Sequence, residues 1–316
     1  MKKTPKSLFF AMFSMILIGL VFGCQTPGEK LAEKAPPQYA HPEAIASTDW
    51  LESHLGDDDI RVVDCSVKFI NPKSYNEGHI PGAVSLDVIG PLSDPKGRVP
   101  LLILPKEQFE ILMGKLGISN DTTVLVYDAF GGSWSARLWW ALMYYGHNDV
   151  KILNGGFGRW KAEGRKIETE PIIPSQTVFK ANPQPSLLSE IEDVKQAIEK
   201  DDIYLVDALN AEHHFGEKPF GPTLAPAGHI PTAINVPGPS NINMETGLFL
   251  SPIELKNHWS VLKAKPQDKV ITYCGAGYYG AFDLFALYQL GYRNISLYDG
   301  SWMEWISDST RPVSVE

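Results

Sequence analysis

The 316-residue chain contains only three cysteines, Cys24, Cys65 and Cys274. Three cysteines so far apart form neither a disulfide framework nor a metal-ligand cluster, so we expect no bound metal. Basic residues are also few, since 28 lysines and arginines stand against 37 acidic residues and leave a net charge of −9. This balance argues against nucleic acid or an anionic membrane surface as a partner.

The N-terminus predicts export. An apolar run over residues 8–22 follows Lys2, Lys3 and Lys6, as in a secretory signal, and is short for a membrane span. The string Val-Phe-Gly-Cys at 21–24 resembles a bacterial lipoprotein processing site. We therefore expect residues 1–23 to be removed and Cys24 to carry lipid. An uncleaved anchor helix or a plain signal is the alternative.

In either case the body is exported, into the periplasm or otherwise outside the cytoplasmic membrane, and its only membrane contact is the anchor. The polar residues that follow indicate a tether over 24–40. Loss of residues 1–23 would leave 25 basic and 37 acidic residues, a net charge of −12. That charge provides no general steering of anionic substrates.

Cys274 occupies the position at which a strand is expected to turn into a helix. The apolar run 270–273 precedes it, glycines follow at 275, 277 and 280, and apolar residues at helical spacing begin at Phe282. Successive backbone N–H groups of such a loop, and the positive end of the helix dipole, favour a thiolate. Cys274 is therefore the candidate nucleophile. A buried core cysteine is the alternative.

Cys65 follows the apolar segment 60–64 and indicates structural packing, with pairing or exchange with Cys274 as a second interpretation. Because the exported compartment is oxidising, a reactive Cys274 would need reduction or sulfur loading. A thiol reductant protein is then an additional partner.

The chain repeats one unit. Gly-His-Ile-Pro occurs at 78–81 and again at 228–231, and Gly146 precedes Trp160 by the same fourteen residues as Gly291 precedes Trp305. Strands alternate with helices in each half, so each is expected to be a mostly parallel sheet with helices on both faces. The predicted α/β domains are 41–170 and 186–316. Residues 171–185, with four prolines, are the linker, expected to pack across the other domain.

Within each repeat we expect helices over 44–55, 106–116 and 135–145, then 188–200 and 251–262. Pro105 and Pro252 are placed at the first helical position, and Ser251 with Glu254 has capping-box spacing. Alignment of Tyr127 with Tyr273 puts Asp128 where Cys274 stands. The first domain therefore has no nucleophile.

Two strings carry a family resemblance: Cys-Gly-Ala-Gly at 274–277 and Tyr-Asp-Gly-Ser-Trp-Met-Glu-Trp at 298–305. With the Gly-His-Ile-Pro string they resemble the two-domain rhodanese-type sulfurtransferases, over nearly everything after about residue 40. The resemblance implies two tandem rhodanese-like domains, the first inactive and forming one wall of the cleft. The first domain of that family has a Ser-x-x-Arg-x-Trp-Trp string, and residues 134–140 of this chain resemble it. Arg137 in this string either reaches the cleft or makes a structural pair at the loop of its own domain.

The resemblance also implies the chemistry. The Cys274 thiolate takes the outer sulfur of a donor such as thiosulfate or 3-mercaptopyruvate as a persulfide, and passes it to a thiol or to cyanide. No organic cofactor is implied. The expected substrate-binding residues are the cysteine loop and one histidine: Gly275, Ala276, Gly277, Tyr278, Tyr279, Gly280 and His213.

The chain departs from the family at the anion-binding positions. Leu209 and His213 stand where the family has arginines, and the cysteine loop has no basic residue. His213 would hold an anion only when protonated, and a surface or packing role is its alternative. Tyr278 and Tyr279 either line the cleft or pack the helix start. His79 and His229 recur in both repeats, which indicates a structural role.

Two other functions share part of this pattern. Cysteine phosphatases share the strand, cysteine loop and helix, but they need an arginine six residues after the cysteine, where this chain has Gly280. A lipoprotein that holds sulfane sulfur on Cys274 for a partner, without efficient turnover, is the alternative that the missing arginines favour.

Overall fold

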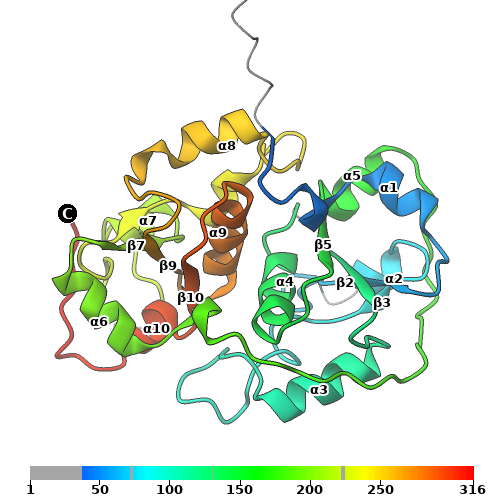
Figure 1. Ribbon diagram of the computed structural model, residues 1–316, viewed down its shortest axis with the longest axis horizontal. Helices are drawn as coiled ribbons and strands as arrows, with labels where there is room; N and C mark the ends of the chain where they lie inside the picture. Colours follow the sequence, from blue (N-terminus) through cyan, green and yellow to red (C-terminus); the bar gives the residue numbers. More distant parts are fainter. Residues whose placement is uncertain (1–37, 72–73, 130, 222–224) are drawn as a thin grey trace, which may run out of the picture. The chain divides into compact units, whose positions relative to one another are not determined.

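The computed structural model describes residues 38–71, 74–129, 131–221 and 225–316. The expected signal segment and Cys24 lie outside these residues, as does most of the expected tether. Among the described helices, none has the length and apolar character needed to cross a membrane. The described residues belong to one compact unit that holds two five-stranded sheets (Figure 1).

The first sheet has the order β1-β5-β4-β2-β3, with every neighbouring pair parallel. Its strands are β1 (Ile45–Ala46), β2 (Ile60–Asp64), β3 (Val84–Ser85), β4 (Thr123–Tyr127) and β5 (Val150–Leu153). Its helices are α1 (Thr48–Ser53), α2 (Ser74–Glu77), α3 (Lys106–Lys115), α4 (Ser135–Tyr144) and α5 (Gly156–Ala162), with a 3-10 turn, η1 (Pro42–Ala44).

The second sheet repeats this order as β6-β10-β9-β7-β8, again parallel throughout. Its strands are β6 (Leu188–Ser189), β7 (Ile203–Asp207), β8 (Ile234–Asn235), β9 (Lys269–Tyr273) and β10 (Ile295–Tyr298). Its helices are α6 (Ile191–Glu199), α7 (Ala211–His214), α8 (Pro252–His258), α9 (Tyr278–Gln289) and α10 (Ser301–Trp305). Three 3-10 turns are η2 (Pro185–Leu187), η3 (Gly238–Asn241) and η4 (Trp259–Val261).

The predicted α/β fold with two repeated parallel sheets is therefore confirmed. The register repeats too, since Asp64 pairs with Tyr127 in the first sheet and Asp207 with Tyr273 in the second. This equivalence supports the alignment that places Asp128 where Cys274 stands.

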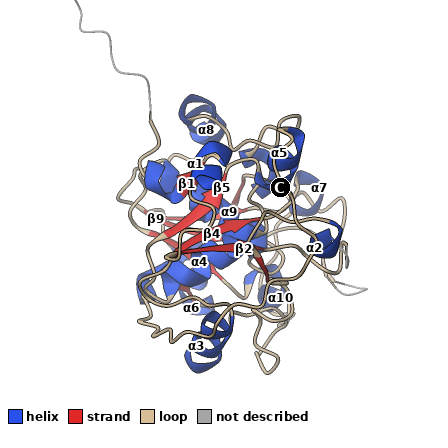
Figure 2. Ribbon diagram, turned by 90° about the vertical axis from the view of Figure 1, so that its right-hand side faces the viewer, coloured by secondary structure: helices blue, strands red, loops and turns tan. Residues whose placement is uncertain are grey.

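Side chains of each central strand alternate between two apolar layers, as a strand buried on both faces requires. In β4, Val124 and Val126 pack in the cluster that contains α3 and α4, whereas Leu125 and Tyr127 pack with α1 and α5. Figure 2 shows the strands at the centre of the molecule with helices outside them. Each sheet is thus the middle of three layers.

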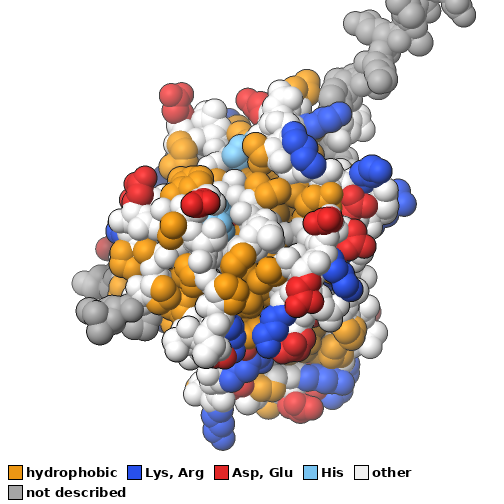
Figure 3. Space-filling view, turned by 90° about the vertical axis from the view of Figure 1, so that its left-hand side faces the viewer, with side chains coloured by type: hydrophobic (Ala, Val, Ile, Leu, Met, Phe, Trp, Pro, Cys, Tyr) orange, Lys and Arg blue, Asp and Glu red, His pale blue; other side chains and the backbone are white. Residues whose placement is uncertain are grey.

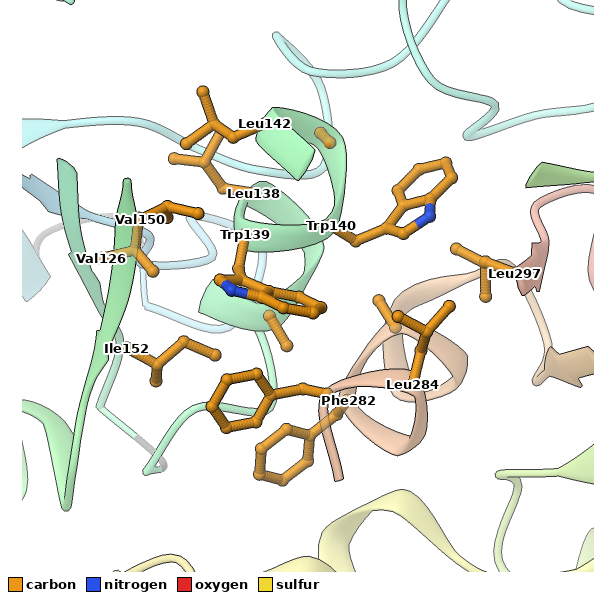
Figure 4. Close-up of a cluster of buried hydrophobic side chains, with 14 of the residues drawn as sticks. Val126, Leu138, Trp139, Trp140, Leu142, Val150, Ile152, Phe282, Leu284 and Leu297 are labelled. Atoms are coloured by element: carbon orange, nitrogen blue, oxygen red, sulfur yellow. The ribbon is translucent and has the colours of Figure 1, made fainter. Parts of the chain in front are cut away.

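The two domains share one apolar core. Helix α4 of the first domain packs against α9 of the second, and Trp139 meets Phe285 edge-on with ring centroids 5.0 Å apart. Figure 4 shows Trp139 and Trp140 facing Phe282 and Leu284 across this contact. Aromatic burial on this scale makes Trp139→Ala cost about 3–5 kcal/mol. The position of one domain against the other is thereby held by packing.

On the face that Figure 3 shows, at the side of the second domain, apolar side chains gather between charges of both signs, so no single sign of charge covers it.

Two predicted helices were wrong at their starts. The segments 44–55 and 188–200 were each expected to be one helix, but each begins with a two-residue edge strand, β1 or β6. These strands pair with β5 and β10 through Ile45–Ile152 and Leu188–Leu297. A strand this short has no periodicity of its own, so only its partner defines it. Pro105 is the N-cap of α3 and not its first residue, whereas Pro252 and the Ser251–Glu254 capping box are as predicted.

The proline-rich connection runs over the first domain, the packing expected for a long linker. The Thr177 amide donates to the Gly114 carbonyl at 3.0 Å, and the Asn182 amide to the Tyr145 carbonyl at 2.9 Å. Phe179 is buried between these contacts. The chain thus crosses to the second sheet as an ordered strap.

Candidate active site

Cys274 lies at the carboxyl end of β9, the central strand of the second sheet, one loop before α9. Its amide donates to Ser301 Oγ at 3.2 Å, and its carbonyl accepts from the Trp302 amide at 2.9 Å. The residue is only 3% exposed. These bonds fix the cysteine backbone against α10, so the thiol has a defined position.

The loop after Cys274 turns its amides onto the sulfur, as the sequence predicts. The backbone N–H groups of Gly280, Ala276 and Tyr279 face the sulfur and lower the pKa of the thiol. Burial acts in the opposite direction and is the larger effect, and Asp207 adds to it, so the pKa of Cys274 is raised. The expectation of a favoured thiolate at rest is therefore wrong. The amides offset only part of the cost of burying the charge.

Gly277 is required by both conformation and space. Its φ is +83°, in the left-handed region, and it is the N-cap of α9. A Cβ here would lie 2.8 Å from Nη1 of Arg137. Gly275 and Gly280 are required for space alone, since a Cβ would lie 2.0 Å from Phe220 and 3.0 Å from the Tyr273 Cα respectively.

The wall around the sulfur is apolar. Cys274 clusters with Ala208 and Leu209, both buried, and Phe220 and Tyr279 pack against this cluster. Ala208 and Leu209 are held in place because the Asp207 carboxylate accepts the Leu209 amide at 3.0 Å. Sequence reasoning missed Phe220, because the segment after α7 has no periodicity that would indicate which side chain turns inward.

His213 lies behind this wall. Its ring meets Phe220 edge-on at 5.6 Å, its Nδ1 is 2.9 Å from the Lys218 carbonyl, and its Nε2 is 3.7 Å from Glu212. Phe220 contacts both His213 and the apolar cluster around Cys274, whereas His213 is not part of that cluster.

Arg137 crosses from the first domain to the cysteine loop. Its Nη1 donates to Oδ1 of Asp299 in the second domain at 2.5 Å, and its Nη2 to the Leu101 carbonyl at 3.0 Å. The guanidinium also lies over the rings of Trp140 and Tyr278. Arg137 was expected either to reach the cleft or to form a structural pair at the loop of its own domain. The second interpretation is wrong for its ion pair, because the carboxylate partner belongs to the second domain.

The two tyrosines of the loop differ. Tyr278 is buried and donates to the Val88 carbonyl at 3.1 Å, so it packs the domain contact. Tyr279 is half-buried and faces Trp134 of the first domain, with ring centroids 6.0 Å apart. Tyr279 also lines a cavity of about 660 Å³ between the domains, and Tyr278 does not. One tyrosine packs and the other lines the cleft.

In the first domain, Asp128 fills its own loop. Its carboxylate accepts the amides of Gly132, Trp134 and Ser135 at 3.1, 2.7 and 2.8 Å. The loop that would hold a thiolate in this copy holds a fixed carboxylate instead.

Cys65 is buried one strand away, and both it and Cys274 are free thiols, so the pairing of these two is not present.

His79 and His229 have structural contacts. His229 stacks on His214 at 3.6 Å, with its Nδ1 2.8 Å from the His214 carbonyl, and His79 stacks on Tyr75 at 3.9 Å. The backbones of His79 and His229 also pair with Glu168 and Ser314. Both histidines thus tie down the segment that follows each sheet.

A duplicated parallel sheet, with a cysteine and its amide loop in one copy only, defines a tandem domain protein with a single thiol centre. The profile of the Rhodanese-like domain matches residues 47–163 and 190–308. The chain belongs to the rhodanese family.

Its relatives span nearly the same length. The sulfur carrier protein TtuD of Thermus thermophilus is 36% identical, over 84% of this chain and 95% of its own. The thiosulfate/3-mercaptopyruvate sulfurtransferase 2 of Arabidopsis thaliana is 32% identical, over 86% of each chain. The crystal structure of SseA from Escherichia coli, a 3-mercaptopyruvate sulfotransferase, superposes with a TM-score of 0.74 at 29% identity, over 82% of this chain and 98% of its own.

Proposed function

We propose that this protein is a sulfurtransferase that moves a sulfane sulfur from a donor to a thiophilic acceptor through a persulfide on Cys274. The observation that carries the proposal is the convergence of three loop amides on one thiol at the end of a central strand. Names of relatives support it, since they include thiosulfate/3-mercaptopyruvate sulfurtransferase.

Each step follows from this geometry. The Cys274 thiolate attacks the outer sulfur of the donor, the bond that holds this sulfur breaks, and the donor fragment leaves with the electron pair. An acceptor thiolate or cyanide then attacks the outer sulfur of the persulfide, and Cys274 leaves as the thiolate. Amides fixed before the reaction stabilise negative charge on the sulfur in both steps.

A carrier role is the second candidate. The cysteine loop is present, but Leu209 occupies a position where the family has an anion-binding arginine. One relative is named a sulfur carrier protein. In this role Cys274 holds the sulfur until a partner protein removes it, and turnover with small acceptors is slow.

The test is the intact mass of the full chain after incubation with each sulfur donor. A gain of one sulfur, about 32 Da, that cyanide discharges is expected for wild type and not for Cys274→Ser. Cys65→Ser, which removes the buried cysteine of the first domain, is the matched control and should load normally. Loading without turnover would favour the carrier. No loading with any donor would refute a persulfide on Cys274.

We also propose that the body is exported and anchored by lipid on Cys24, with residues 1–23 removed. The charge and apolar pattern of the N-terminus supports this. Metabolic labelling with a fatty acid should mark wild type and not Cys24→Ala. Equal labelling of the two would refute the anchor.

A further inference from the structure

The wall around Cys274 is unsuited to an anionic donor. Thiosulfate and 3-mercaptopyruvate carry negative charge, and moving a charge into an apolar site without a partner is costly. The side chains that cluster with the sulfur, from Ala208, Leu209, Phe220 and Tyr279, provide no cation.

The cations of the described residues near this site are already paired. Arg137 is 1% exposed, and its guanidinium donates to Asp299 and to the Leu101 carbonyl. Arg159 lines the neighbouring cavity, but its Nε donates to Glu163 at 2.5 Å. Each guanidinium is thus balanced by a carboxylate, which weakens its attraction for a doubly charged donor.

The cavity beside the cysteine loop is suited to an organic group. It measures about 660 Å³, within the range of about 300–1,000 Å³ typical of small-molecule sites and far more than thiosulfate needs. Trp134, Ile242, Met244 and Tyr279 contribute its apolar lining, and Arg159 and Glu245 its charges. Tyr279 belongs both to this lining and to the cluster around Cys274.

From these contacts we propose that the sulfur donor is an uncharged organic polysulfane, R–S–S–S–R, whose sulfur chain reaches Cys274 while one R group occupies the cavity between Trp134 and Tyr279. The inference rests on the proposed sulfur transfer at Cys274 and specifies its donor class.

The transfer balances with a thiol as co-reactant. The Cys274 thiolate attacks the central sulfur, one S–S bond breaks, and R–S⁻ leaves with the electron pair, so that Cys274 carries –S–S–R. An acceptor thiolate R′–S⁻ then attacks the sulfur that bears R. The products are R–S–S–R′ and the Cys274 persulfide. A second acceptor thiolate removes the outer sulfur as R′–S–S⁻ and restores Cys274.

The test compares dibenzyl trisulfide, thiosulfate and 3-mercaptopyruvate as donors to the full chain. The quantity measured is the rate of Cys274 loading by intact mass, divided by the rate of a free cysteine derivative with the same donor at the same pH. We expect this ratio to be at least about tenfold larger for the trisulfide than for either anion, which corresponds to about 1.4 kcal/mol.

Leu209→Arg tests the wall directly. The arginine should lower the trisulfide ratio and raise that of thiosulfate by about tenfold each, because it supplies the missing cation. Ile253→Arg, at an exposed apolar position of α8, is the matched control and should leave both ratios unchanged. Should Leu209→Arg fail to fold, the wild-type donor comparison decides by itself.

A larger ratio for thiosulfate or 3-mercaptopyruvate in wild type would overturn the donor class and leave sulfur transfer at Cys274 standing. Absence of loading by all three donors in the folded, reduced protein would overturn both.

Discussion

The guanidinium of Arg137 and the carboxylate of Asp299 form a buried ion pair, 2.5 Å from Nη1 to Oδ1, that joins the two domains beside the cysteine loop. The second oxygen of Asp299 accepts the amide of Ile103 at 2.8 Å. Both partners of Asp299 thus come from the first domain. The first domain thus fixes the cysteine loop of the second.

Removal of Arg137 should destabilise the protein strongly. In Arg137→Ala, Asp299 is left as a buried charge with one amide donor, and such a loss costs about 3–5 kcal/mol. Urea unfolding followed by circular dichroism measures it. Arg159→Ala, which breaks the more exposed pair with Glu163, is the control and should cost about 1 kcal/mol or less. Equal effects of the two variants would contradict a structural role of the Arg137–Asp299 pair.

Cys274 should become reactive only at alkaline pH. Burial raises the pKa of its thiol, so the midpoint of alkylation by iodoacetamide is expected above the ordinary value of about 8.5. Below the midpoint, the rate should rise about tenfold for each pH unit, as the thiolate fraction does. Intact mass measures the rate, and Cys65, which is fully buried, should not react. A rate that is already constant at pH 7 would show that the amides outweigh burial.

Asp283 should make stability depend on pH. Burial raises the pKa of this carboxyl well above its usual range, and its Oδ1 accepts from Asn241 at 2.7 Å. A raised pKa in the folded state favours the protonated carboxyl. The stabilisation is therefore complete below the pKa of the unfolded state, about 3.9, and is lost as pH rises through the pKa of the folded state.

Asp283→Asn keeps an acceptor for Asn241 and cannot ionise. Its free energy of unfolding relative to wild type should therefore increase as pH rises from about 4 to about 9. Chemical unfolding at several pH values measures the difference. Asp121→Asn, at an exposed position, is the control. A difference that stays constant over this range would mean that Asp283 does not titrate differently on folding.

Gly277→Ala should damage both stability and loading. A left-handed φ costs an alanine about 1 kcal/mol, and the added Cβ would meet Arg137 at 2.8 Å. We expect a total loss of about 2–3 kcal/mol in urea unfolding and slower persulfide formation, because the loop amides shift. Gly164 has a similar φ of +70° with open space around it. Gly164→Ala should therefore lose only the conformational part and load normally; matching losses would exclude the contact with Arg137.

Much of the fold was predictable because short-range sequence patterns indicate its strands, helices and repeat. Residues 124–127 and 270–273 are short runs of β-branched, aliphatic and aromatic residues, which predict strands, and the repeated turn and tryptophan spacing indicates the duplication. The two-residue strands β1 and β6 were missed since their pairing with β5 and β10, and not their own residues, defines them.

Residue type and spacing are enough to predict the duplicated α/β fold, the position of Cys274 at a strand end, and an aspartate, Asp128, in place of a nucleophile in the first domain. Each follows from short-range spacing and residue type. Three features could not be predicted in this way: Arg137 pairs with Asp299, Phe220 covers the cysteine loop, and burial of the thiol raises its pKa more than the amides lower it. These depend on which distant segments meet and how much water they exclude, and no local pattern encodes that.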